Sequence, residues 1–452
     1  MTLDRYHRFS IFIILFAGLG GILYGYDIGI IAGALIFIKQ EIVLTHAQIS
    51  TLVAAVLGGG SIAILIAGPL ADRFGRRRMI SVSAIIFIVG ILLLVSSHHF
   101  IGILIGRLIE GIGVGIITVI IPLYLAESAP SSIRGMGVTA FQLFLTGGIL
   151  CAYLFSLIFA PTHSWRAMFL CSLVPATLLG IGSLLIIESP RWLFFKGKKE
   201  QALQALSNSR SAQETEHDVF LMTQLEIKNN KKQQKEHLFQ RHILFPFAIA
   251  LAVAVLTQLT GINVFLQLST LILQHSGLHS NVQSMLGSVS VGLVNFVITA
   301  VAMLCIDRIG RKPLLLIGTG GLTLSLIYLG AIQYFLSPGT LQGYLTISGF
   351  IFFILFFAIG PGVVVWLAIS ELMPMSIRGK GIAICLFANS LASTLFAMIF
   401  LSLVKQIGYA GVFWMCGGFT FLYLLLAVFF IPETKDKSLE EIEQYFYEQQ
   451  RI

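Results

Sequence analysis

Charged residues are scarce in this sequence. Asp, Glu, Lys and Arg make up 11% of its 452 residues, whereas apolar residues make up 56%; an average soluble protein carries about 25% charged residues. No soluble fold of this length buries so much apolar surface, so the composition excludes a cytosolic enzyme. It also excludes a disordered chain, which would leave that surface in water. An integral membrane protein with many helices is the class that remains.

Signals for metal, phosphate or cofactor binding are also missing. The five cysteines lie in apolar stretches without any CxxC spacing, and we interpret them as small core residues. The glycine-rich segment 106–111 lies in an apolar run, with no preceding strand and no P-loop lysine, which argues against phosphate binding. No nucleophile, base and metal set converges anywhere. We therefore expect no metal, no cofactor and no enzymatic activity.

Long apolar runs dominate what is present. They fall at about 9–38, 47–71, 79–97, 100–126, 136–160, 166–187, 243–274, 282–305, 313–336, 341–373, 380–404 and 409–431. At about 20 residues per crossing, these runs predict twelve transmembrane helices and an all-α fold. The first run is too long for the core of a cleavable signal peptide.

The basic residues predict the orientation of these helices. If both termini and the central loop are cytoplasmic, 25 of the 29 Lys and Arg residues lie on that side. Three lie outside (Lys39, Arg166 and Lys405), and Arg107 lies within a span. The net charge of +8 is then a topogenic signal, so we expect no nucleic-acid partner.

Three motifs occur twice, in the same order and at nearly the same offset. Asp72-Arg-Phe-Gly-Arg-Arg recurs as Asp307-Arg-Ile-Gly-Arg-Lys, and the segment 127–135 recurs at 371–379. Glu188 has a weaker counterpart in Glu433. The repeats predict two pseudo-symmetric six-helix bundles, the architecture of transporters that rock around a midplane site. The expected divisions are a bundle at 1–187, a cytoplasmic linker with short helices at 188–242, a second bundle at 243–431 and a cytoplasmic tail at 432–452.

The chain resembles the sugar porter family of the major facilitator superfamily, and within it the bacterial proton-coupled pentose and hexose symporters. The resemblance rests on motifs spread over nearly the whole length: 25–27 (Gly-Tyr-Asp), 72–77, 106–111, 122–127 (Pro-Leu-Tyr-Leu-Ala-Glu), 188–193 (Glu-Ser-Pro-Arg-Trp-Leu), 261–263 (Gly-Ile-Asn), 360–366 and 432–434 (Pro-Glu-Thr). It implies a major facilitator fold and the import of a monosaccharide by proton symport with alternating access.

Charges inside apolar spans are costly and therefore point to function. There are three: Asp27, Arg107 and Glu110. The resemblance implies that Asp27 lies near Arg107 and takes and releases the coupling proton; the alternative is a permanent Asp–Arg brace between helices. Glu110 is three residues after Arg107, on the same helix face. It is either the local partner of Arg107, or it is a second proton carrier or tunes Asp27.

A sugar site needs amides for hydroxyl groups and aromatic faces for the ring. By resemblance, and with one extra amide peculiar to this chain, the candidates are Gln142, Gln258, Asn263, Gln267, Asn295, Trp366 and Asn389. Any one of these amides could instead bind helices to each other. Gln258 and Asn263 can share a side only if their helix is broken, which Gly261 permits. The chain departs from the family pattern at Thr257, Val363, Gln267-Leu268 and Ser390, which leaves the identity of the sugar open.

Clusters of alternating charge at the cytoplasmic ends of the helices are predicted to form the inner gate. They comprise Asp72, Arg73, Arg76, Arg77, Glu127, Arg134, Glu188 and Arg191 in the first half, and Asp307, Arg308, Arg311, Glu371, Arg378 and Glu433 in the second. Topogenic charge alone would explain the arginines but not the repeated acids.

These observations predict a secondary active transporter in the lipid bilayer, a monomer in a bacterial inner membrane with both termini cytoplasmic. Its partners would be a monosaccharide and the coupling proton. The first alternative is a facilitative sugar or polyol uniporter. The second, from another class, is a membrane sensor that binds a sugar without moving it.

Overall fold

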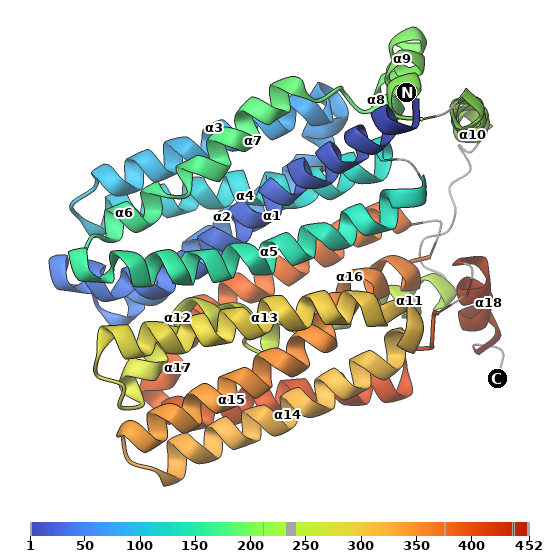
Figure 1. Cartoon of the computed structure of the whole chain (residues 1–452). Helices are drawn as coiled ribbons and strands as arrows, with labels where there is room; N and C mark the ends of the chain where they lie inside the picture. The colour runs from blue at the N-terminus through green and yellow to red at the C-terminus, as the bar shows by residue number, and fades with distance from the viewer. Residues whose placement is uncertain are drawn as a thin grey trace.

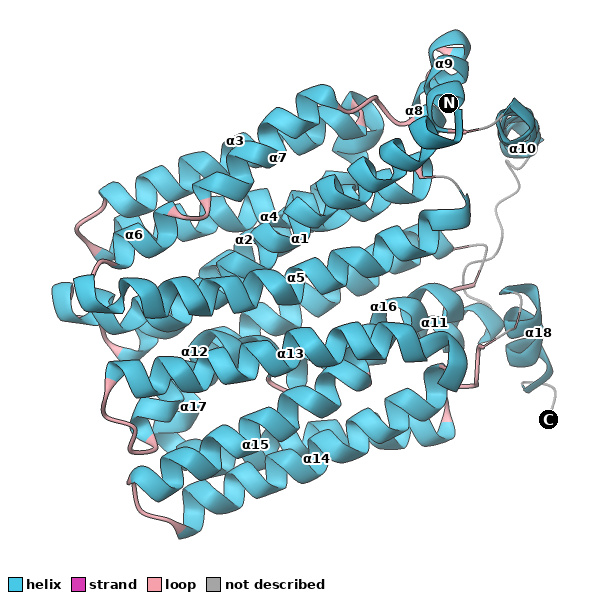
Figure 2. Cartoon of the chain, viewed as in Figure 1, coloured by secondary structure: helices cyan, strands magenta, loops and turns pink. Residues whose placement is uncertain are grey.

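The computed structural model describes residues 2–129, 131–210, 212–231, 241–374, 377–435, 437 and 439–449. These residues are almost entirely helical, and they include no strand (Figure 2).

The helices of the first half and of the central segment are α1 (Thr2–Glu41), α2 (His46–Phe74), α3 (Arg76–Ser96), α4 (Phe100–Ser128), α5 (Ser131–Phe159), α6 (Trp165–Leu170), α7 (Leu173–Leu185), α8 (Pro190–Phe195), α9 (Lys199–Ser209) and α10 (Ala212–Lys231). A short 3₁₀ turn, Ala160–Thr162, follows α5. The helices of the second half and the tail are α11 (Arg241–Leu259), α12 (Ile262–His275), α13 (Asn281–Ile309), α14 (Arg311–Phe335), α15 (Thr340–Ile359), α16 (Pro361–Leu372), α17 (Arg378–Phe429) and α18 (Leu439–Gln449).

The helices make twelve crossings, as the apolar runs predict. Eleven segments are long and apolar enough to span a membrane. The longest of them, α17, has 52 residues and turns at Gly408, where the backbone leaves the helical region at φ 71°, so it forms two crossings. Three other crossings consist of two helices each: α6 with α7, α11 with α12 and α15 with α16.

The crossings form two bundles that lie side by side, the first drawn in blue to green and the second in yellow to red (Figure 1). In the first, α1 packs along α5, and α4 packs between α2 and α3; in the second, α14 packs against α15 and α17. Both chain ends, α8 to α10 and α18 lie at one end of the molecule. We call this the terminal end and the opposite end the far end.

The helices outside the bundles are anchored at the terminal end by small apolar faces. In α9, Ala202, Ala205 and Leu206 are buried against Leu193 and Phe194 of α8. In α18, Ile442 and Phe446 are buried in the core of the second bundle. Helix α18 therefore packs on the second bundle, whereas α8, α9 and α10, which contributes Met222, share a small apolar cluster of their own.

Hydrogen bonds between the two halves join them in the middle and toward the far end. The Tyr153 hydroxyl of α5 donates to the carbonyl of Leu266 in α12 at 2.7 Å. Ser61 of α2 and Ser390 of α17 are linked through their hydroxyls at 2.8 Å. Near the far end, the Leu401 amide donates to the Ser50 hydroxyl at 3.3 Å. These bonds hold the halves together in the middle and toward the far end.

Candidate functional site

The charged residues of the apolar spans form one cluster inside the first bundle. Nη1 of Arg107 in α4 donates to Oδ1 of Asp27 in α1 at 2.6 Å and to Oε2 of Glu110 at 2.9 Å. All three side chains are at most 1% exposed. The prediction that Asp27 lies beside Arg107 therefore agrees with the geometry, and Glu110 is bonded to the same nitrogen.

Several polar atoms of this cluster have no partner among the described residues. They are Oδ2 of Asp27, Nε and Nη2 of Arg107, and Oε1 of Glu110, all of them buried. The guanidinium also lies over the ring of Phe169, 5.4 Å from its centre. An acid held in this way loses much of its attraction to Arg107 when it is protonated, so proton binding and helix contact are linked.

A second polar group lies in the second bundle, where the seventh crossing is broken. Helix α11 ends at Leu259, Gly261 adopts φ 92°, and α12 begins at Ile262. A positive φ is readily available to glycine, so Gly261 permits this break without strain. As a result, Nδ2 of Asn263 donates to Oε1 of Gln258 at 2.9 Å. The two amides meet across the break, as the sequence predicts.

These two amides form hydrogen bonds to Asn389 and Ser393 of α17. Nε2 of Gln258 donates to Oδ1 of Asn389 at 3.0 Å, and Nδ2 of Asn389 donates to the carbonyl of Ala254 at 2.8 Å. Nδ2 of Asn263 also donates to the hydroxyl of Ser393 at 2.9 Å. The network contains donors and acceptors but no charge, which suits the hydroxyl groups of a neutral sugar.

The other four candidates are not joined to this network. Asn295 of α13 is buried, whereas Gln142 of α5 and Trp366 of α16 are half-buried. Their polar side-chain atoms make no hydrogen bond within the described residues. The amide nitrogen of Gln267 in α12 is buried and has no acceptor there. These side chains keep unused hydrogen-bonding capacity, and no hydrogen bond among the described residues joins them to the network.

Two departures from the family pattern acquire local roles in the structure. The Thr257 hydroxyl donates to the carbonyl of Val253 at 2.7 Å and lies 3.3 Å from the Tyr423 hydroxyl. Ser390 bonds across to Ser61, which also lies 3.2 Å from Thr394. The sequence offers no signal for Ser61, Ser393 or Tyr423, because small hydroxyls and single aromatics are common in helix interfaces.

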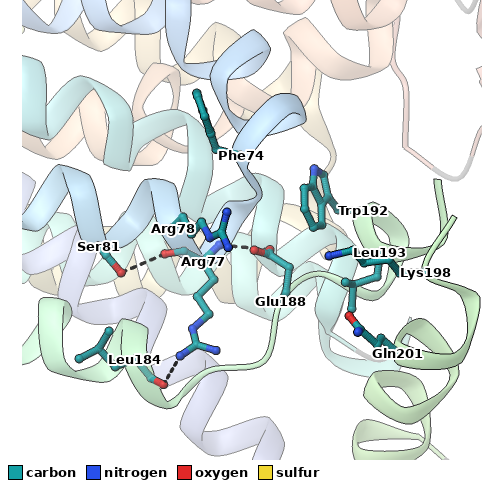
Figure 3. A pocket seen from close by; sticks show the side chains of 10 residues that line it. All are labelled: Phe74, Arg77, Arg78, Ser81, Leu184, Glu188, Trp192, Leu193, Lys198 and Gln201. Carbon is teal, nitrogen blue, oxygen red and sulfur yellow. Dashed lines mark hydrogen bonds between the residues drawn. The ribbon is translucent and has the colours of Figure 1, made fainter. Parts of the chain in front are cut away.

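At the terminal end of the first bundle, the repeated motif closes a compact charged cluster. Gly75, with φ 95°, ends α2 and precedes α3. One oxygen of Glu188 accepts the amides of Arg76 and Arg77 at 2.8 and 3.1 Å. The Arg76 guanidinium forms two bonds to Glu127, at 2.8 and 2.9 Å. Figure 3 shows Glu188 directed at the start of α3 and Arg77 reaching toward Leu184.

The second bundle repeats this arrangement. Gly310, with φ 100°, separates α13 from α14. Glu433 accepts the amides of Arg311 and Lys312 at 3.0 and 3.1 Å. Arg311 contacts Glu371 at 3.4 Å. The sequence repeat is therefore a repeat of backbone conformation and of bonding.

The remaining gate candidates are more exposed. The carboxylates of Asp72 and Asp307, 74% and 81% exposed, contact Arg76 and Arg311 at 3.1 and 3.2 Å. Arg73 and Arg191 lie over the rings of neighbouring Phe74 and Phe195, the Arg308 carbonyl accepts a bond from Lys435, and Arg378 begins α17. The side chain of Arg134 lies outside the described residues. Every ion pair seen here joins residues of the same half, so a clamp between the halves stays a prediction.

The hydrogen bonds that backbone amides donate to Glu433 change the pKa of its carboxyl. Burial raises the pKa of its carboxyl, but the amides of Lys435, Arg311, Lys312 and Thr434 outweigh burial and bring the pKa below its ordinary value of 4.5. The carboxylate is thus held ionised at the start of α14, where a helix N-terminus favours negative charge.

Two cavities lie at opposite ends of the molecule, away from the buried amides. One, of about 430 Å³ at the terminal end of the first bundle, is lined by Arg77, Arg78, Glu188, Trp192 and Lys198 among others (Figure 3). The other, of about 480 Å³ at the far end, lies between the halves; Lys39 and His46 face His275, Lys405 and Tyr409 across it. The second cavity lies where a solute from the far side would first meet both halves.

Comparisons with known proteins agree with this architecture. The sequence profile described as "Sugar (and other) transporter" matches residues 13–446. The galactose-proton symporter of Escherichia coli (strain K12) is 32% identical over 440 residues, covering 96% of this chain and 94% of the relative. A partially occluded inward-open structure of the xylose transporter XylE from E. coli has a TM-score of 0.81 and 27% identity, covering 95% of this chain and 99% of XylE. A structure described as the proton:xylose symporter XylE bound to 6-bromo-6-deoxy-D-glucose has a TM-score of 0.80 and 28% identity, covering 97% and 99%.

Proposed function

Because the chain belongs to the sugar porter family of the major facilitator superfamily, we propose that it imports a monosaccharide, a pentose or hexose, by proton symport with alternating access. Proteins of this family move solutes across a membrane and perform no covalent chemistry on them. Relatives described as galactose-proton and proton:xylose symporters support both the sugar and the proton.

The observation that carries the proton part of this proposal is the buried bond between Asp27 and Arg107. A uniporter has no need of a titratable carboxylate in its apolar interior, where ionised groups are costly. Protonation of Asp27 would weaken its bond to Arg107 and let α1 and α4 shift against each other. A permanent brace, or a uniporter that contains one, would explain why Asp27 and Arg107 are in contact. Neither alternative explains why the contact is made by a carboxyl group that can be protonated and so release Arg107.

The amide network would hold the sugar. Gln258 is bonded to both Asn263 and Asn389, so a bound sugar would replace some of these bonds with bonds to its own hydroxyls. Gln142, Gln267, Asn295 and Trp366 would complete the site when the halves close around the substrate. A sensor would need none of the gate clusters, which are repeated in both halves.

We assign the terminal end to the cytoplasm, because it carries the great majority of the lysines and arginines. The present conformation, in which the halves are bonded in the middle and toward the far end, would then open inward. In the outward-facing state, the clusters around Arg76 and Arg311 would approach each other and close the inner gate. We further propose a monomer in a bacterial inner membrane.

Uptake by purified protein in proteoliposomes tests this proposal. Labelled xylose, galactose, glucose and a polyol are offered with and without an inward proton gradient. We expect one or more monosaccharides to accumulate above the external concentration only with the gradient. Equilibration that ignores the gradient would identify a uniporter, and binding without any flux would identify a sensor.

A further inference from the structure

The buried cluster of the first bundle contains one cation and two acids. Arg107 contributes the positive charge, and Asp27 and Glu110 contribute the carboxyl groups. With both acids ionised, the cluster carries a net negative charge in an interior where no side chain of the three is more than 1% exposed. A net charge in such surroundings is strongly disfavoured.

Among the described side chains, no other charged residue is bonded to this cluster. The charged or titratable side chains of α2 and α3 lie at their ends: His46, Asp72 and Arg73 in α2, and Arg76, Arg77 and Arg78 in α3. Arg134 is the fourth residue of α5, α7 has no charged residue, and Arg166 of α6 is bonded to Glu41. Tyr24, three residues before Asp27 on α1, carries an uncharged phenol, and the Tyr26 hydroxyl donates a hydrogen bond to the Met168 carbonyl.

We propose that the presence of Glu110 makes the cluster retain one proton at neutral pH. Glu110 then stays ionised beside Arg107, and Asp27 carries the proton at the start of each transport cycle. This inference rests on the proposed symport. One proton makes the cluster neutral, whereas a pair of Asp27 and Arg107 alone would be neutral without it. Glu110 thus decides which protonation state is the resting one, and it acts through Arg107 as a positioning residue.

The positions of the three residues on their helices explain how the proton could then be carried. Arg107 and Glu110 are three residues apart on α4 and move together, whereas Asp27 belongs to α1. Glu110 is also packed tightly against α3, since a Cβ on Gly90 would come within 2.9 Å of its Cγ. When α1 and α4 separate, Arg107 keeps Glu110 as its counter-ion. Asp27 can leave as an uncharged acid and later return its proton to water.

The unpaired atoms fit a shared proton. Oδ2 of Asp27 and Oε1 of Glu110 are buried and have no donor among the described residues, and the other oxygen of each carboxyl is bonded to the same nitrogen. The two carboxyl groups therefore lie within a few ångströms of each other. The proton on one acid can be donated to the other, with no bond broken except that O–H bond.

The pH dependence of uptake by Glu110→Gln tests the proposal. Glutamine keeps the size of the side chain, which the contact with Gly90 requires. Initial rates of gradient-driven uptake are measured from about pH 5 to about pH 8 at a constant pH difference. In the variant, Asp27 must bind its proton against Arg107 alone, so we expect the half-maximal rate to move to lower pH by about 1–3 units. Transport should recover at acid pH, and Glu110→Asp should stay close to the unchanged protein.

Glu41→Gln is the matched control, because it also removes a glutamate from an arginine pair. Glu41 bonds to Arg166 at 2.7 Å near the far end, away from the cluster. Its profile should not move. A Glu110→Gln profile that coincides with that of the unchanged protein would overturn the proposal and leave Glu110 as a brace. Failure of the unchanged protein to accumulate sugar in the gradient would instead overturn the proposed symport.

A measurement on the unchanged protein covers the case in which Glu110→Gln does not fold. Sugar is added to purified protein in weakly buffered detergent solution at neutral pH, with a pH indicator. Because the proton is already bound, we expect sugar binding without proton uptake. Stoichiometric proton uptake on sugar binding at neutral pH would contradict a resting cluster that holds its proton.

Discussion

The two bundles bury different chemistry. The first holds an arginine and two acids bonded through one nitrogen, Nη1 of Arg107. The second holds neutral amides, with Gln258 bonded to both Asn263 and Asn389. The proton and the sugar would therefore be handled in separate halves. Their coupling must pass through contacts between the halves, such as Tyr153 with Leu266 and Ser61 with Ser390.

The largest effect on this division should come from Asp27→Asn. Asparagine keeps the shape and can still meet Arg107, but it cannot take up a proton. We expect gradient-driven accumulation to be lost completely, whereas exchange of labelled for unlabelled sugar persists because the amide network is intact. Accumulation and counterflow in the same proteoliposomes provide the measurement. Retained accumulation would show that Asp27 is only a brace.

A change in the second bundle should weaken sugar binding and leave proton coupling unchanged, the reverse of what we expect for Asp27→Asn. Asn389→Ala removes a partner of Gln258 and of the Ala254 carbonyl. A lost hydrogen bond of about 1.4 kcal/mol corresponds to about a 10-fold rise in KM for the sugar, with an unchanged number of protons moved per sugar. Asn281→Ala is the control, because the Asn281 side chain accepts a bond from Gln274 near the far end, away from the amide network. Equal KM values for the two variants would remove Asn389 from the sugar site.

The two charged clusters at the terminal end offer a matched comparison of stability. Arg76 forms two bonds to Glu127 with both side chains 7% exposed, whereas Arg311 contacts Glu371 once at 3.4 Å with 16% and 18% exposed. Breaking a buried pair costs about 3–5 kcal/mol, and breaking a looser, more hydrated one costs about 1 kcal/mol. Thermal unfolding in detergent should therefore show a larger drop in Tm for Arg76→Ala than for Arg311→Ala. The reverse order would contradict the ranking.

The smallest effect concerns pH and Glu433. Its folded-state pKa lies below the ordinary 4.5 because four backbone amides hold the carboxylate. Its stabilising contribution is therefore complete above pH 4.5 and is lost as pH falls through the lower folded-state value. We expect Glu433→Gln to lower Tm at neutral pH and to approach the unchanged protein as the pH falls below 4.5. A Tm difference that does not depend on pH would show that the charge is unimportant.

Much of the architecture could be predicted from the sequence, because long apolar runs leave a spanning helix as the only way to satisfy the backbone in lipid. The paired motifs around Gly75 and Gly310 predicted that the bundles repeat, and the structure gives both glycines nearly the same φ. The contact of Asp27 with Arg107 follows from the resemblance. The break at Gly261 was expected only as a possibility.

Contacts that depend on tertiary packing could not be predicted in this way. Nothing in the order of residues says that Ser61 meets Ser390, which is 329 positions away. Arg166 was counted only as an outside charge, yet it binds Glu41 and lies over Trp165. The ion pairs of the gate residues depend on which conformation the halves adopt, a choice that composition and spacing do not determine.

The central claim is that a proton bound in the first bundle enters together with a sugar bound in the second, and one experiment can test it. Sugar is added outside proteoliposomes that lack any imposed gradient, and external pH and internal labelled sugar are followed together. We expect the exterior to become alkaline as sugar enters, at a fixed ratio of protons to sugar, and Asp27→Asn to abolish the pH change. Sugar entry with no change of pH in the unchanged protein would contradict the account.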